Sequence, residues 1–80
     1  MTPNQQPTTE TQRIGLRLAA LRKGLGLSQR ALADKAGVGQ TQVVNTEKGH
    51  YSPNVETLSK MLDAMGYQLA IIPQGTTLVD

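Results

Sequence analysis

The sequence predicts a mainly α-helical fold of four to five short helices, followed by one short C-terminal β-strand that pairs across a dimer. Two observations support this prediction. Apolar residues recur at helical spacing through most of the chain, and glycines or capping residues interrupt them at short intervals. Near the C-terminus the helical spacing gives way to a short β-prone run that ends at a proline.

The size and composition of the chain indicate one small domain. Its 80 residues include no cysteine and a single histidine, so neither a disulfide nor a metal cluster is expected to stabilise it. Stability must come from well-packed helices or from a second subunit. No apolar run approaches the roughly 20 residues that cross a bilayer, and the N-terminus lacks a signal-peptide pattern. We expect a cytoplasmic protein with no membrane partner, cofactor or metal.

The chain divides into four segments by composition. Residues 1–10 are polar and contain prolines, which predicts a flexible tail. Residues 11–66 carry the helical patterns and form the folded domain. Residues 67–73 are the predicted dimerisation strand, and residues 74–80 are a loose C-terminal tail.

The first predicted helix starts at Thr11 and ends near Gly24, where Gly24 and Gly26 interrupt the pattern. Four apolar residues at spacings of four, three and four define its buried face. They are Ile14, Leu18, Leu21 and Leu25.

Two short helices follow, separated by a tight turn. Ser28 is a good N-cap for a helix over residues 29–36, and Gly37 closes that helix. The next helix runs from about 40 to 48, with Val43 pointing inward. Two short helices joined by three or four residues that include glycine are typical of a helix-turn-helix.

The fourth predicted helix covers residues 55–65 and is capped by Asn54. Its expected buried face consists of Val55, Leu58, Met61, Leu62 and Met65. The strand that follows has no partner within the chain, so a strand from a second subunit is the physical expectation. The residues expected at that interface are Tyr67, Leu69, Ile71 and Ile72.

The charge of the chain is unevenly distributed. Residues 11–50 carry seven basic and two acidic side chains, whereas residues 51–80 carry one basic and three acidic side chains. The first half can therefore face a polyanion, although a solvated surface explains a moderate basic bias about as often.

The third predicted helix begins with uncharged polar side chains where a surface helix usually carries charges. Glutamine, threonine and exposed valine suit the edges of bases in the major groove of DNA, into which the second helix of a helix-turn-helix inserts. We expect Gln40 and Thr41 to be the main base readers, on the same side as Val44 and Asn45. A polar surface without a task is the alternative.

Other candidate side chains have two readings each. Arg30 and Lys35 are either contacts to the DNA backbone or solvated charges. His50 and Tyr51, in the loop after the third helix, are either phosphate contacts or ordinary turn residues. Catalysis is not expected, because the sequence contains no phosphate loop, no cysteine nucleophile and no constellation of serine, histidine and aspartate.

The segment LSQRALADKAGVGQTQVVNTEKG, residues 27–49, closely resembles the helix-turn-helix of lambda-repressor/Cro-type regulators, the xenobiotic-response-element class. The likeness extends over residues 14–66. It implies a lambda-repressor-like DNA-binding domain in which base contacts come from Gln40, Thr41 and Gln42.

The same resemblance implies further roles for individual side chains. It places Gln29 at a phosphate, hydrogen-bonded to Gln40, and brings Lys48 close to phosphate. It also implies a buried ion pair between Arg22 and Glu47. The expected partner is double-stranded DNA with a pseudo-palindromic operator.

The C-terminal half, NTEKGHYSPNVETLSKMLDAMGYQLAIIP, is similar to that of HipB-type antitoxins. This similarity implies a homodimer that represses its own operon and binds a HipA-type kinase toxin, and a phage-type repressor without a toxin is the alternative. Two departures from the family pattern are Thr46, at a position that is usually large and apolar, and Val44, at a position that is commonly small or polar. The first is expected to loosen packing, and the second prevents transfer of a base preference.

Overall fold

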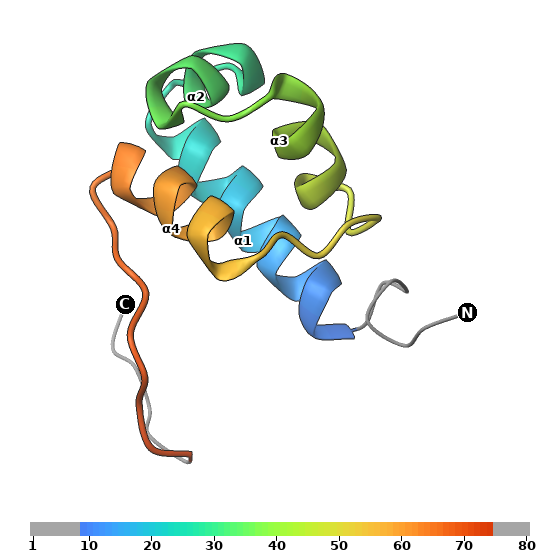
Figure 1. Ribbon diagram of the computed structural model, residues 1–80, viewed down its shortest axis with the longest axis vertical. Helices are drawn as coiled ribbons and strands as arrows, with labels where there is room; N and C mark the ends of the chain where they lie inside the picture. The colour runs from blue at the N-terminus through green and yellow to red at the C-terminus, as the bar shows by residue number, and fades with distance from the viewer. Residues whose placement is uncertain (1–8, 75–80) are drawn as a thin grey trace.

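The computed structural model describes residues 9–74 as four short helices and an extended C-terminal segment (Figure 1). The helices are α1 (Thr9–Gly24), α2 (Gln29–Ala36), α3 (Gln40–Glu47) and α4 (Val55–Ala64). The predicted mainly helical fold is confirmed, with four helices in this part of the chain. The remainder of the two predicted tails, 1–8 and 75–80, lies outside the described residues.

Local capping chemistry sets the ends of the helices. The Ser28 hydroxyl accepts a hydrogen bond from the backbone N–H of Ala31 (2.9 Å) at the start of α2. The Asn54 side chain does the same for Thr57 (2.7 Å) at the start of α4. Gly37 ends α2 with φ of 72°, a left-handed conformation that glycine adopts without steric cost. These boundaries agree with the sequence prediction.

The hydrophobic core lies where the four helices meet. Its buried members are Leu18, Leu32, Ala33, Val43, Met61 and Met65. Half-buried apolar residues surround them, including Leu21, Leu58 and Leu62. With six buried apolar side chains among residues 9–74, the core is small, as the length of the chain implies.

Three residues expected in the core are largely exposed. Leu25 lies in the turn after α1 and is 52% exposed, and Ile14 is 38% exposed beside an open groove. Val55, in the first turn of α4, is 73% exposed. The helical spacing correctly identified one side of each helix, but Ile14 borders the open groove between α1 and α4, whereas Leu25 and Val55 lie at helix ends.

The axes of α1 and α3 approach each other closely at Gly15. A Cβ atom built on this buried glycine would lie 2.2 Å from the carbonyl oxygen of Thr46 and 2.9 Å from that of Glu47. Both contacts are with backbone, which cannot move aside as a flexible side chain can. Glycine is therefore required here for α3 to pack against α1.

Thr46 faces the core from α3 and is 1% exposed. Its Oγ1 has no hydrogen-bond partner among the described residues. A buried hydroxyl without a partner loses its hydration without compensation. The departure noted in the sequence at this position therefore places a polar atom in the core.

The C-terminal segment leaves the helix bundle after α4. The Tyr67 N–H donates to the carbonyl of Leu62 (2.8 Å), and the chain beyond it runs away from the helices (Figure 1). Residues 67–73 have no regular secondary structure, residue 74 lies in a turn, and no strand occurs within residues 9–74. A strand requires a neighbour to pair with, so the predicted dimerisation strand stays a prediction.

Gly15→Ala tests the close approach of α1 and α3. We expect it to lower the free energy of unfolding by about 2 kcal/mol, because the new methyl group overlaps backbone that cannot relax. The measurement is urea denaturation followed by circular dichroism. Gly24→Ala is the matched control, since nothing lies within 4 Å of its Cβ position. Equal stability of the two variants would contradict the packing argument.

Thr46→Val tests the cost of the buried hydroxyl. Valine has nearly the same shape, so the substitution removes an unsatisfied polar atom, and we expect the free energy of unfolding to rise by about 1 kcal/mol. Thr41→Val, on the exposed side of α3, should change stability by less than about 0.5 kcal/mol. A destabilised Thr46→Val protein would show that the hydroxyl has a favourable interaction.

Candidate nucleic-acid interface

Helices α2 and α3 form a compact helix-turn-helix. Each has eight residues, and three residues, 37–39, connect them. Leu32 and Ala33 anchor α2 in the core, while Val43 anchors α3 with 0% exposure. This anchoring turns the opposite side of α3 away from the bundle.

The exposed side of α3 carries the uncharged side chains predicted to face bases, Gln40, Thr41, Val44 and Asn45, hereafter the uncharged row. Gln40 and Thr41 are exposed in the first turn, and Val44 and Asn45 are half-buried. Within residues 9–74 the side chains of Gln40 and Thr41 make no hydrogen bonds, so their donors and acceptors face solvent. Such a surface can offer amide, hydroxyl and methyl groups to base edges.

Gln42 has a structural role that the sequence prediction did not include. Its Oε1 accepts a hydrogen bond from the backbone N–H of Gly39 (3.0 Å), which stabilises the first turn of α3. The side chain is half-buried. With its amide oxygen engaged, Gln42 is less available to bases than Gln40 and Thr41.

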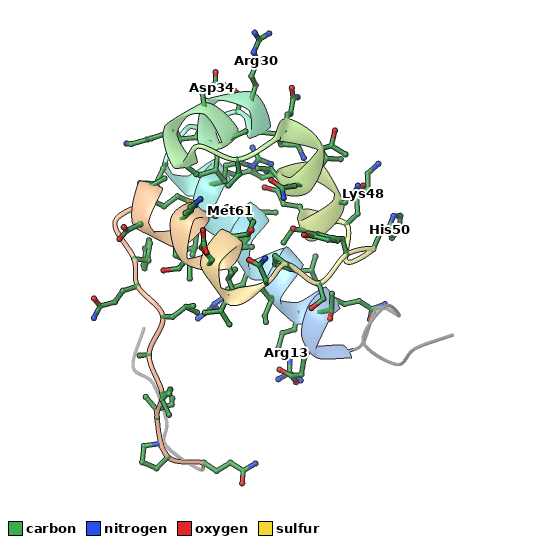
Figure 2. The ribbon with its side chains drawn as sticks, viewed as in Figure 1. Arg13, Arg30, Asp34, Lys48, His50 and Met61 are labelled. Atoms are coloured by element: carbon green, nitrogen blue, oxygen red, sulfur yellow. The ribbon has the colours of Figure 1, made fainter. Side chains whose placement is uncertain are left out.

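Basic side chains flank the row. Arg30 projects from α2 away from the bundle, and Lys48 and His50 project outward beside the end of α3 (Figure 2). Lys48 is the C-cap residue of α3, and no acidic residue occurs in the first turn of that helix. Asp34 is the acidic side chain beside Arg30 on α2. The surface around α3 is therefore neutral at its centre, basic beside its end at Lys48, and of mixed charge on α2, where Asp34 accompanies Arg30.

A buried ion pair connects α3 to α1. Arg22 Nε donates to Glu47 Oε2 at 2.6 Å and a second guanidinium nitrogen donates to Oε1 at 3.0 Å, with both side chains under 10% exposed. Arg22 also donates to the carbonyl of Leu27 (2.8 Å), in the turn before α2. The structure thus brings together the two charges that the family resemblance paired.

The pKa of Arg22 responds to this environment. The hydrogen bond to Glu47 raises the pKa of the guanidinium above its ordinary value, although burial acts in the opposite direction. Because the ordinary pKa is already far above neutrality, Arg22 carries its charge at every pH at which the protein is handled. Arg22 therefore supplies a constant positive charge to this pair.

Gln29 joins the same network. Its Nε2 donates to Glu47 Oε1 at 3.0 Å, and the side chain is half-buried. The resemblance implied a hydrogen bond between Gln29 and Gln40, whereas in the structure the Gln29 amide donates to the Glu47 carboxylate, which is charged and therefore a strong acceptor. Gln29 therefore connects α2 to α3 through this hydrogen bond.

Other predicted residues lie around this surface. Tyr51 is 36% exposed in the loop that follows α3, and Lys35 is exposed in the last turn of α2. Gly15 and the capping role of Gln42 were absent from the sequence prediction. The one available signal was Gly15, an isolated glycine within a helical pattern, which indicates close packing.

Metal binding and membrane insertion receive no support from residues 9–74. This part of the chain has no cluster of three or more histidine, cysteine, aspartate or glutamate side chains suited to a metal ion. None of its helices combines the length and apolar character needed to cross a membrane.

Comparison with known proteins places this geometry in a family. A family model described as Helix-turn-helix (HTH_3) matches residues 18–72. An uncharacterized HTH-type transcriptional regulator of Haemophilus influenzae is 41% identical over 56 residues, covering 70% of this chain and 57% of that protein. The immunity repressor protein of Bacillus phage phi105 is 33% identical over 66 residues, covering 82% and 46%. The chain spans about half the length of each of these two relatives.

Solved structures share the fold. The restriction-modification controller protein C.AhdI from Aeromonas hydrophila superposes with a TM-score of 0.73 at 28% identity, over 76% of this chain and 92% of that chain. A toxin-antitoxin module from Streptococcus pneumoniae superposes with a TM-score of 0.68 at 32% identity, over 81% and 71%.

Arg22→Met tests the contribution of the ion pair. The substitution leaves the Glu47 carboxylate buried without its cation, and we expect the free energy of unfolding to fall by roughly 3–5 kcal/mol. Lys60→Met is the control, because Lys60 pairs with Glu56 at 3.4 Å on the exposed side of α4 and its loss should cost less than about 1 kcal/mol. Equal losses in thermal or urea unfolding would show that the buried pair is not structurally important.

Proposed function

This chain belongs to the HTH_3 family of Cro/lambda-repressor-like helix-turn-helix transcriptional regulators, and from that premise we propose that it is a sequence-specific repressor that binds its operator as a homodimer. The observation that carries the proposal is the exposed, uncharged start of α3, held in position by the buried network of Arg22, Glu47 and Gln29. In a helix-turn-helix this turn enters the major groove.

The exposed residues divide into two groups with different tasks. Gln40, Thr41 and Val44 read base edges, with Gln42 and Asn45 at the margin of that contact. A second group binds the phosphate backbone without reading sequence, and its members are Gln29, Arg30, Lys48 and Tyr51. Gln29 supports this contact from a half-buried position, since its amide nitrogen is engaged with Glu47.

The homodimer supplies the second half of the recognition surface. Two copies present their α3 helices about 34 Å apart, one turn of DNA, to a pseudo-palindromic site. The strand formed by residues 67–73, with Tyr67, Leu69, Ile71 and Ile72, provides the contact between the copies. The named functions of the relatives are those of regulators, and a repressor of this kind acts in the cytoplasm on the nucleoid.

A finer assignment is an antitoxin that represses its own operon and neutralises a HipA-type kinase toxin. The match to a toxin-antitoxin module supports this assignment. The match to a phage immunity repressor supports the alternative, a phage-type repressor without a toxin. Co-purification of a kinase-like protein with the tagged chain would favour the antitoxin, and a chain that purifies alone from its native host would favour the phage-type repressor.

Titration onto DNA tests the proposed function and the division of tasks. The protein is titrated onto the duplex immediately upstream of its own gene and onto a scrambled duplex, at two salt concentrations. Gln40→Ala should weaken operator binding by about 1–3 kcal/mol and relax discrimination at one base pair. Lys48→Ala should weaken binding to both duplexes alike and reduce the salt slope by about one unit per half-site.

Lys60→Ala is the charge-matched control, because this lysine lies on α4 and is paired with Glu56. We expect two protomers to bind each site. We also expect binding to the upstream duplex to be tighter than binding to the scrambled duplex at both salt concentrations. Equal binding to the two duplexes would contradict sequence-specific repression at this promoter. If Gln40→Ala and Lys48→Ala behaved alike, the division into base readers and phosphate contacts would be wrong.

A further inference from the structure

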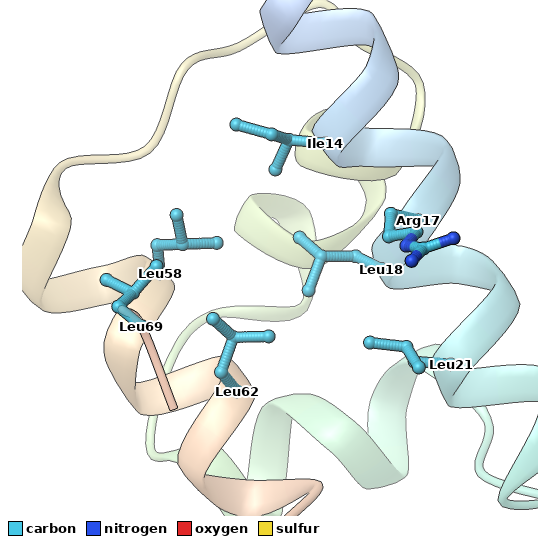
Figure 3. A pocket seen from close by; sticks show the side chains of 7 residues that line it. All are labelled: Ile14, Arg17, Leu18, Leu21, Leu58, Leu62 and Leu69. Carbon is cyan, nitrogen blue, oxygen red and sulfur yellow. The ribbon is translucent and has the colours of Figure 1, made fainter. Parts of the chain in front are cut away.

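An apolar groove opens between α1 and α4 (Figure 3). Its volume is about 180 Å³, and its lining comes from Ile14, Leu18 and Leu21 of α1, Leu58 and Leu62 of α4, and Leu69 of the C-terminal segment. Arg17 is the one charged residue at its edge. An open apolar groove of this kind is a candidate contact surface for another chain.

The C-terminal segment carries apolar side chains that the other described residues, 9–66, leave exposed. In this segment, residues 67–72, hereafter the arm, Ile71 is 103% exposed and Tyr67, Leu69 and Ile72 are 44–49% exposed. Apart from the Tyr67 N–H, no backbone group of the arm is hydrogen-bonded to another of the described residues. An extended apolar segment with free backbone donors and acceptors is prone to pair with another chain.

The arm and the groove meet at Leu69, which lines the groove from the arm. Ile71 does not line this groove; it borders a separate shallow hollow with Val55 and Ala70, in which its side chain stays exposed. Each chain therefore has an apolar groove that is open and an apolar arm that is uncovered.

We propose that the arm of a second copy of this chain occupies the groove, with Ile71 of one copy packed between α1 and α4 of the other, and that the exchange is reciprocal. A twofold axis makes this contact self-complementary, because each copy supplies one arm and one groove and no arm is left over. The inference rests on the proposed homodimer and specifies its interface: the arm packs across the partner's helices in addition to any pairing between the two arms.

A second copy fits better than a foreign protein for two reasons. Both halves of the contact are on one chain, whereas a foreign segment in the groove would leave the arm uncovered. The groove also lies on the α4 side of α1, while α3 packs on another side, so filling the groove leaves Gln40 and Thr41 exposed (Figure 1). The exchanged dimer is thus compatible with DNA binding by both copies.

Cysteine cross-linking tests the exchange directly, because the chain contains no cysteine. A chain carrying Ile71→Cys is mixed with a differently tagged chain carrying Ile14→Cys, and the mixture is oxidised gently without DNA. The control pairs Ile71→Cys with Leu16→Cys, since Leu16 is 70% exposed on α1 and does not line the groove. We expect the mixed disulfide with Ile14→Cys to form at least about tenfold faster than the control disulfide.

Two results would overturn the exchange. One is equal cross-linking to Ile14→Cys and Leu16→Cys, and the other is a disulfide formed solely between two Ile71→Cys chains, which would mean that the arms pair without entering the groove.

Sedimentation equilibrium without DNA provides the second measurement. Ile71→Asp should weaken the dimer by roughly 100-fold, because each of two isoleucines contributes about tenfold, whereas Leu16→Asp should leave it unchanged.

Ile71→Asp cannot act by unfolding the monomer, because Ile71 is fully exposed within its own chain. A wild-type chain that stays monomeric at every concentration, or an Ile71→Asp chain that dimerises normally, would overturn the inference. Since neither assay contains DNA, the outcome is separate from that of the operator titration. A monomer that still binds the operator specifically would uphold DNA binding and reject the exchanged arm.

Discussion

The ion pair between Arg22 and Glu47 determines where α3 lies, and the exposed surface of α3 depends on that position. The guanidinium forms two hydrogen bonds to the carboxylate and a third to the turn before α2, and Gln29 adds a contact from α2 itself. Three helices therefore meet at one carboxylate. A buried charge that loses its partners is costly, so this network favours a single arrangement of the helices. Gly15 makes that arrangement sterically possible by letting the backbones of α1 and α3 approach.

Helix boundaries were predictable from the sequence because the chemistry that ends a helix is local. Ser28 and Asn54 cap the residues immediately after them, and Gly37 adopts its left-handed conformation within the turn itself. The identity of the buried residues was less predictable. Ile14 and Val55 fit the helical spacing, yet their exposure depends on the separation of α1 and α4, which the periodicity of one helix does not report. Gly15 was missed for the same reason, since its role is defined by a helix distant in sequence.

In the candidate interface, exposed positions could be predicted from the sequence, but individual hydrogen-bond partners could not. The exposed position of Gln40 and Thr41 followed from the pattern of α3 and its anchor Val43. The hydrogen-bond partners of Gln42 and Gln29 did not, because an amide can donate or accept toward several neighbours and the folded geometry selects among them. The ion pair came from family resemblance, since two charges 25 residues apart are not paired by spacing alone.

The distribution of structural tasks along α3 bears on how such a protein acquires a new target site. Gln42 and Glu47 hold the helix in place, whereas Gln40 and Thr41 make no hydrogen bonds within residues 9–74. Substitutions at Gln40 and Thr41 leave the fold intact, so a preference for a new DNA sequence can evolve there without loss of stability. Substitutions at Gln42 and Glu47 remove hydrogen bonds that hold α3 in position. If Gln40 and Thr41 read bases as proposed, these two positions should vary most freely between duplicated genes of this type, because their side chains have no task in holding the fold.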